Sequence, residues 1–222
     1  MPLRRPILPL LALSLGCVDA VVDLPVGPHA ATAQLPVREV PAQLLDANGA
    51  LRRLQCDAAT PCPQTGSARA TLRCEGGACA VAPFPMDVTT GDIDLTAYST
   101  YRDYANALDE LRLEAVSVQL TGARAGNSLG PMQVWWTGAS NATGVSERLL
   151  GSSPRVALTQ GAVTIPVTLN AAGAAELVQR VLRGEVRFRV RIAGTIEVGA
   201  GALPDPEVSL AVTLLLHLRG SL

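Results

Sequence analysis

A long stretch near the C-terminus alternates apolar and polar residues with a period of two. In EVRFRVRIAGTIEV, residues 185–198, the large apolar side chains share one face and the arginines and glutamates share the other. This pattern predicts a β-strand with one buried face, because successive side chains of a strand point to opposite faces of the sheet. Residues 207–218, EVSLAVTLLLHL, repeat the pattern. The turn-rich segment between them leads us to expect an antiparallel hairpin.

Three further segments predict strands, at residues 113–120, 132–137 and 162–169. The first changes phase at Ala115 and Val116, as a β-bulge requires. In the third, Pro166 has no N–H to donate, which restricts the segment to a sheet edge or to pairing on one side. Alternating strands need a second layer to bury their apolar faces. We therefore expect a mainly β body over residues 84–222, built as an antiparallel β-sandwich or an open barrel.

One or two short helices are expected within this body. Asn170 is a good helix N-cap and Gly184 a good C-terminal stop, and the apolar residues between them repeat at helical spacing. A shorter helix is expected over residues 100–108. Trp135 and Trp136 are adjacent, so on a strand one of them must face away from the core. We expect a helix to cover the outward tryptophan; the alternative is a ligand or partner surface.

The N-terminus has the three parts of a secretory signal peptide. Arg4 and Arg5 precede an apolar run that is too short to span a bilayer, which requires about 20 residues. The run ends on Gly16 and Cys17, and this ending resembles the lipobox of bacterial lipoproteins. The resemblance implies that residues 1–16 are removed and that the Cys17 thiol carries diacylglycerol and its new amino group an acyl chain such as palmitate. Ser14 stands where the family usually has leucine, and an ordinary leader cleaved near Ala20 is the alternative.

The lipoprotein resemblance also has implications for location. Val18 follows the cysteine in place of aspartate, which under the sorting rule of some Gram-negative lipoproteins points to the outer membrane. Residues 17–50 are therefore interpreted as a lipidated N-terminus followed by a proline-rich tether, in which His29 is solvated. The prolines that favour a tether are Pro25, Pro28, Pro36 and Pro41.

Residues 51–83 form a four-cysteine module. An even number of cysteines in an exported chain predicts two disulfides, and the spacing leaves all three pairings open. Zinc is the competing interpretation, but the gaps between the cysteines are wide and no histidine lies nearby. Glu75–Ala78 has the composition of a hairpin turn, which places Cys74 and Cys79 side by side. The four cysteines are Cys56, Cys62, Cys74 and Cys79. The module loosely resembles those of uncharacterised Gram-negative envelope lipoproteins, which implies no activity.

Composition excludes several functions. All 18 basic residues are arginine, so lysine-dependent phosphate loops and Schiff-base cofactors are excluded. The chain has a formal net charge of −1, so nucleic acid is an unsuitable partner. His217 is the one histidine of the body and no G-x-S-x-G motif is present, so we expect no enzyme and no histidine-rich metal site. Asp87, Asp92 and Asp94 could suggest calcium, but they lack the EF-hand spacing, and Asp92 and Asp94 fit the exposed face of a strand, so we expect no metal or cofactor.

Arg187, Arg189 and Arg191 form a basic stripe on one face of the strongest predicted strand. Such a row can hold the phosphates or carboxylates of an anionic polymer, or it can form a solvated face with acidic partners on neighbouring strands. The sequence as a whole predicts a lipid-anchored envelope protein that serves as a non-enzymatic binding or assembly component for an envelope protein or an anionic polymer. The alternative is a carrier with an apolar ligand or lipid between its layers.

Overall fold

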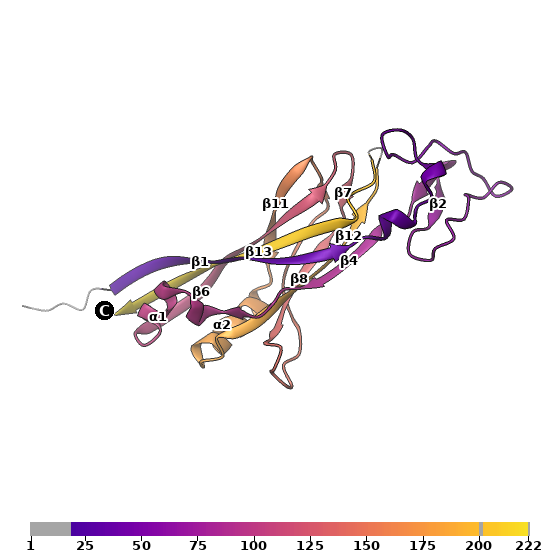
Figure 1. The fold of residues 1–222 in the computed structure, drawn as a ribbon. Coiled ribbons are helices and arrows are strands. Elements are labelled where there is room, and N and C mark those ends of the chain that lie inside the picture. Colours follow the sequence, from indigo (N-terminus) through magenta and orange to yellow (C-terminus); the bar gives the residue numbers. More distant parts are fainter. Residues whose placement is uncertain (1–18, 200–201, 222) are drawn as a thin grey trace, which may run out of the picture.

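The computed structural model describes residues 19–199 and 202–221. Antiparallel strands dominate these residues, together with two α-helices and three short 3-10 helices (Figure 1). The strands are β1 (Asp19–Gln34), β2 (Leu72–Glu75), β3 (Ala78–Val81), β4 (Phe84–Thr89), β5 (Ile93–Asp94), β6 (Leu108–Ala123), β7 (Ser128–Leu129), β8 (Met132–Gly138), β9 (Arg148–Ser153), β10 (Val156–Ala157), β11 (Gly161–Leu169), β12 (Arg187–Glu197) and β13 (Glu207–Ser221). The helices are η1 (Pro36–Glu39), η2 (Ala42–Leu44), η3 (Leu95–Ala97), α1 (Ser99–Tyr104) and α2 (Ala171–Leu182).

The body is an antiparallel sandwich of two layers, which confirms the predicted fold class. One layer has the strand order β1-β13-β6-β11, and the other runs β11-β9-β8-β12-β4. Strand β11 belongs to both layers because its first part pairs with β6 and its last two residues pair with β9. Pro166 lies opposite Ser117 of β6, in the part of β11 that pairs on one side, as predicted. The expected bulge near Ala115 is a register shift between β6 and β13.

The two inner faces form one hydrophobic core. Val118 and Val212 from the first layer and Val134 and Val190 from the second are all 0% exposed. Burying an aliphatic side chain of this size contributes about 1.5–3 kcal/mol relative to leaving it exposed. The period-two pattern of the sequence therefore decides which face of each strand turns inward.

The predicted hairpin between residues 185–198 and 207–218 is wrong. Strand β12 pairs with β4, β5, β7 and β8, whereas β13 pairs with β1 and β6, so the two strands lie in different layers. The connection between them contains Leu203 and Pro204, which are both buried. Leu203 and Pro204 thus anchor the described part of the connection in the interior as the chain passes from one layer to the other.

The prediction of a tether over residues 17–50 is also wrong for residues 19–34, which form β1. This strand pairs with β13 along nearly its whole length and places Leu24 and Val26 in the core. Its prolines are tolerated because β1 is the edge strand of its layer, where a missing N–H costs no ladder hydrogen bond on the open side. The register shifts between Val26 and His29, and Pro28 lies in this irregularity.

Helix α2 begins and ends where the sequence predicts. The side chain of Asn170 accepts a hydrogen bond from the Gly173 N–H at 2.9 Å, and Gly184 follows the helix with a positive φ of 89°. The left-handed conformation favours glycine there, because at a positive φ a side chain is strained against its own backbone even where the surrounding space is open. The other α-helix, α1, is shorter than the expected span of residues 100–108.

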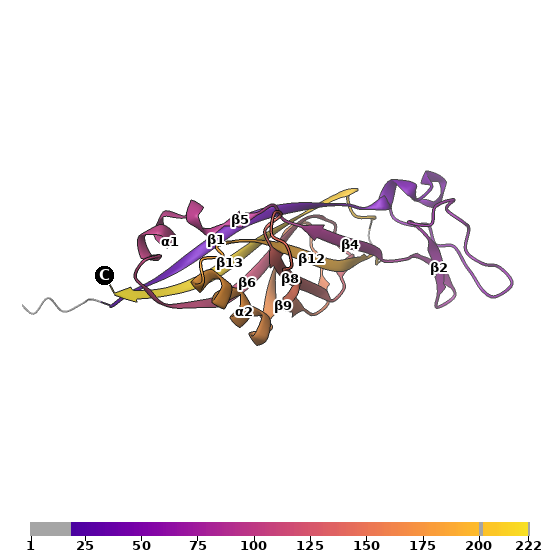
Figure 2. The ribbon, with the colours of Figure 1, turned by 90° about the horizontal axis from the view of Figure 1, so that it is seen from below.

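The described part of the chain is elongated, with the start of β1 and the end of β13 at one end and the cysteine module at the other (Figures 1 and 2). Asp19 at the start of β1 pairs with Ser221 at the end of β13. The two-stranded sheet of β2 and β3 lies at the other extremity, beyond the ends of β4 and β12. The body therefore separates the start of β1 from the module.

Candidate functional site

The arginine stripe lies on the outer face of β12, and each of its guanidinium groups meets carboxylates. Arg187 lies 3.5 Å from both Asp92, which precedes β5, and Asp94, the last residue of β5. Arg189 lies 3.9 Å from Asp92, and its Nε donates to the Gly138 carbonyl at 3.3 Å. The stripe is therefore a polar face with acidic partners, one of the two arrangements that the sequence left open.

Arg191 makes more hydrogen bonds to carboxylates than the other two arginines of the stripe. Its Nε donates to Asp87 of β4 at 2.7 Å, and its NH1 donates to Glu147 at 2.8 Å. Its guanidinium also lies 5.0 Å from the ring centre of Trp135 on β8. The hydrogen bonds with Asp87 are the main cause that raises the pKa of Arg191. An external anion at this position would have to displace carboxylates that already match the guanidinium fork.

We expect acid to weaken this face. The pKa of Asp87 is lowered from 3.8, chiefly by the hydrogen bond from Arg191 and against the opposing effect of burial. A carboxyl whose pKa is lower in the folded than in the unfolded state stabilises the fold above the unfolded pKa, and this contribution is lost as pH falls through the folded value. The loss should therefore occur below about pH 4.

The measurement is the thermal midpoint of the wild type and of Asp87→Asn, taken from about pH 5 to about pH 2. The variant cannot titrate at residue 87, so its midpoint should fall less steeply than that of the wild type. Parallel curves for the two proteins would contradict a stabilising role for this carboxylate. Asp103→Asn, at an exposed position of α1, is a control for the general effect of removing an acid.

The four cysteines form two disulfides, as predicted, and the structure selects one of the three possible pairings. Cys56 is bonded to Cys74, and Cys62 is bonded to Cys79. Cys74 and Cys79 are opposite residues on β2 and β3, which confirms the predicted hairpin. The sulfur atoms of Cys56, Cys62 and Cys79 lie within 4.8 Å of one another, so the two bridges make one compact cluster. As disulfides they provide no thiolate ligand for zinc.

A cavity of about 360 Å³ lies where the module joins the body. Its lining comes from the segment before Cys56, from β3 and from the chain just after β12. The lining residues are Leu51, Arg52, Arg53, Ala78, Cys79, Ala80, Val81, Val198 and Gly199. We call this cavity the junction groove. It combines apolar walls with two arginines.

The sequence reasoning missed Arg52 and Arg53, although a signal was present. They form an Arg-Arg doublet with no acidic residue between Asp46 and Asp57. The regular alternation of the stripe drew attention to arginines that turn out to have acidic partners. The lack of an acid nearby in the chain is the signal that distinguishes Arg52 and Arg53 from the stripe, which begins beside Glu185.

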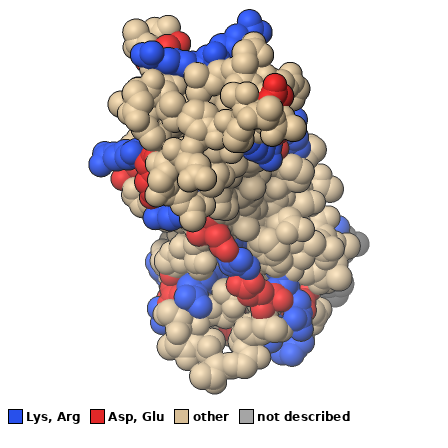
Figure 3. Space-filling view, turned by 90° about the vertical axis from the view of Figure 1, so that its right-hand side faces the viewer, with Lys and Arg blue, Asp and Glu red and all other residues tan. Residues whose placement is uncertain are grey.

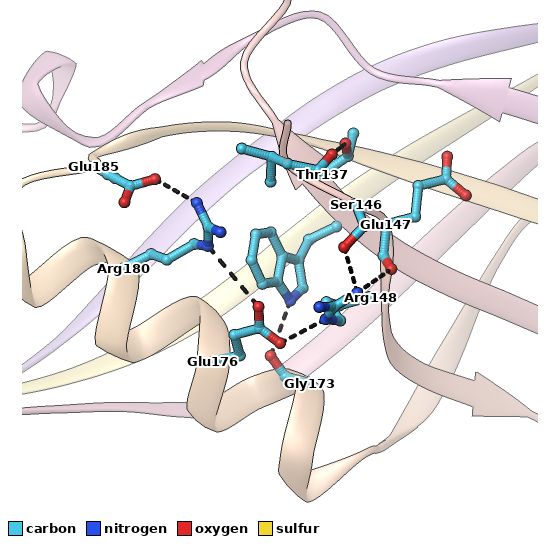
Figure 4. A network of polar contacts seen from close by, with 10 residues as sticks. Thr137, Ser146, Glu147, Arg148, Gly173, Glu176, Arg180 and Glu185 are labelled. Atoms are coloured by element: carbon cyan, nitrogen blue, oxygen red, sulfur yellow. Dashed lines mark hydrogen bonds and ion pairs between the residues drawn. The ribbon is translucent and has the colours of Figure 1, made fainter. Parts of the chain in front are cut away.

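Helix α2 covers the inward tryptophan and not the outward one, contrary to the expectation. Helix α2 lies against the buried Trp136, which is 1% exposed and donates from Nε1 to the Gly173 carbonyl at 2.9 Å. Trp135 is the outward residue, and Arg191 lies over it. The expected helix cover of the outward tryptophan is therefore wrong. Figure 4 shows the surroundings of the helix contact, where Glu176 of α2 meets Arg148 at 2.7 Å.

Both histidines have specific partners. His29 is half-buried, its Nε2 lies 3.0 Å from the Tyr98 hydroxyl, and burial lowers its pKa, so the expectation of a solvated His29 is wrong. His217 has Asp23 as a partner, with 2.8 Å between Nδ1 and Oδ1. His217 does not line any of five prominent cavities in the described part of the chain.

The lipobox prediction falls on Cys17, which lies outside the described residues. Within residues 19–199 and 202–221, no helix has the length and apolar character needed to cross a bilayer. Figure 3 shows the surface at the end of the molecule that carries the module. Charged side chains of both signs lie there in small groups, separated by wide uncharged areas.

The fold and its cross-links define an antiparallel β-sandwich with a disulfide-bonded terminal module. No protein-family model and no curated protein matches the chain. Among solved structures, one from Desmodium yellow mottle tymovirus is 8% identical and covers 100% of this chain and 91% of that one, with a TM-score of 0.28. A thermostable cellulase derived from that of Rhodothermus marinus is 12% identical and covers 88% and 100%, with a TM-score of 0.21. Similarity this low defines neither a family nor an activity.

Proposed function

We propose that this chain is a lipid-anchored envelope protein that acts as a non-enzymatic binding or assembly component. The proposal rests on the distance between the start of β1 and the module. Asp19, two residues beyond Cys17, lies at one end of the molecule and the four-cysteine module lies at the other (Figure 1). An acyl anchor on Cys17 would hold the molecule at one end and direct the module away from the membrane.

The dimensions suit this arrangement. Strand β1 has 16 residues, and a rise of about 3.3 Å per residue gives it a length of roughly 50 Å. Two or more acyl chains hold a protein stably on a bilayer. The module would then meet its partner, an envelope protein or an anionic polymer, well away from the lipid surface. Val18 after the anchor favours the outer membrane as the site of attachment.

The core supports a binding component over a carrier. A carrier needs an apolar space between its layers. Inward residues from both layers, among them Leu120, Ile165 and Ile196, are 0% exposed. Their side chains occupy the space where an apolar ligand would lie, which favours binding at the outer surface.

Intact mass spectrometry of the membrane-extracted protein tests the anchor. In a Gram-negative host, the wild type should yield a chain that begins at Cys17 and carries added acyl mass, and it should fractionate with the outer membrane. Cys17→Ser should carry no acyl mass and should leave this fraction, because the thiol that accepts the lipid is absent. A mature wild-type chain that begins at Val18 or later without acyl mass would defeat the proposal.

Site-directed photo-crosslinking tests the binding role. Gln64 lies exposed in the module, and Arg183 lies exposed on the body after α2. A photoreactive amino acid at position 64 should give discrete adducts in intact cells, whereas the same amino acid at position 183 should give none above background. Absence of adducts at position 64 would count against a module that engages a partner.

A further inference from the structure

The junction groove differs from the other cavities in its charge. It is lined by Arg52 and Arg53, and no acidic side chain is found among its described lining residues. In the other cavities that contain arginine, acids compensate it: Arg124 pairs with Asp205, for example, at 2.8 Å. The junction groove therefore combines two positive charges with no local counter-charge.

The guanidinium groups of the groove keep free hydrogen-bonding capacity. Arg53 makes no hydrogen bond or ion pair with any described residue. Arg52 uses its Nε to donate to the Leu45 carbonyl at 2.8 Å, and this is its one side-chain bond within residues 19–199 and 202–221. A guanidinium carries five N–H donors, so both side chains retain donors for an anion.

The walls of the groove are fixed from several sides. The Cys79 N–H donates to the Leu54 carbonyl at 2.8 Å, and Cys79 is also bonded to Cys62. On the body side, the Gly199 N–H donates to the Asn127 side chain at 3.3 Å. A site that needs little ordering on binding loses less affinity to conformational entropy. The groove is thus prepared to receive a ligand without rearrangement of the module.

We propose that the junction groove binds a small amphiphilic anion, with a carboxylate or phosphate head on a short apolar chain. Arginine matches both heads through paired N–H donors. The chain would lie along the apolar wall formed by Ala80, Val81 and Val198. The volume of about 360 Å³ lies at the lower end of the range for small-molecule sites. This ligand class goes beyond the proposed function, and it requires no lipid on Cys17.

Titration calorimetry with matched ligands tests the assignment. The full chain carries Cys17→Ser in every arm, so that no detergent is needed. The probes are octanoate and octyl phosphate, which differ in the head, together with octanol, which lacks the charge, and inorganic phosphate, which lacks the chain. At least one amphiphilic anion should bind at one site per chain, about tenfold or more tighter than octanol and inorganic phosphate. The ratio of the two anion affinities identifies the preferred head.

Matched arginine variants locate the site. Arg53→Gln should weaken anion binding about tenfold or more, whereas Arg183→Gln removes one exposed arginine elsewhere and should bind as the wild type does. Unchanged circular dichroism would show that Arg53→Gln is folded, and Arg52→Gln provides a second variant at the same groove. Equal affinity in wild type and both groove variants overturns the assignment. Binding of octanol as tight as that of the anions overturns it too, as does absence of binding by any probe.

Discussion

Replacing Gly173 with alanine is expected to destabilise the protein, although alanine is the better helix former. A β-carbon on Gly173 would lie 1.8 Å from the Leu149 carbonyl oxygen, a backbone atom of β9. Relief of this clash requires α2 to move away from the sheet and disturbs the bond between the Gly173 carbonyl and Trp136. Overpacking of this kind costs about 1–3 kcal/mol or more, which exceeds the gain of about 1 kcal/mol in helix propensity.

Urea unfolding of Gly173→Ala measures this effect as a lower transition midpoint. Gly91→Ala is the matched control, because a β-carbon on Gly91 would meet no atom within 4 Å. The control should unfold near the wild-type midpoint. A Gly173→Ala protein as stable as the wild type would show that α2 does not approach β9 as closely as described.

Removing the Cys62–Cys79 bridge with a double serine substitution is expected to loosen the module while the body stays folded. The two cysteines are 17 residues apart in the chain, and closing a loop of this size stabilises by about 3 kcal/mol. The loop between Asp57 and Arg69 has few buried residues, so it has little core to hold it once the bridge is lost. Limited proteolysis should then cut this loop first.

Intact mass spectrometry of the digest distinguishes local from global loss. Cleavage should fall within residues 57–70, and a fragment that contains residues 84–222 should resist further digestion. The wild type should resist at the same protease concentration. Digestion of the body at the same rate as the loop would show that the core of the body depends on this disulfide, contrary to our expectation.

The sequence predicted local features better than the partners of each strand. The alternation around Phe188 and Val190 determines which face is buried, because it reflects the two-residue period of a strand. Strand β12 pairs with β4 and not with β13 because of the path that the chain takes after β12, through Leu203. No local sequence pattern reveals that path. Strand β1 was missed because prolines normally indicate a break, whereas an edge strand can accommodate them.

The candidate sites show the same limit. The sequence placed Arg191 correctly on an outer face, but its partner Asp87 lies on a strand about a hundred positions earlier, and no single-strand pattern reveals that contact. The four cysteines could be assigned to disulfides from their number, whereas their pairing required the fold. The junction groove is made by segments that are distant in sequence, so its lining could not be anticipated from Arg52 and Arg53 alone.

The pairing of β1 with β13 determines how the molecule bears mechanical load. Tension applied to the chain at Asp19 and opposed at Glu207, the far end of β13, acts along the axis of β1. The hydrogen bonds to β13 run across that axis along most of the strand, so they are loaded together in shear and are not peeled apart one at a time. The sandwich is therefore built to resist extension from the end at which β1 begins.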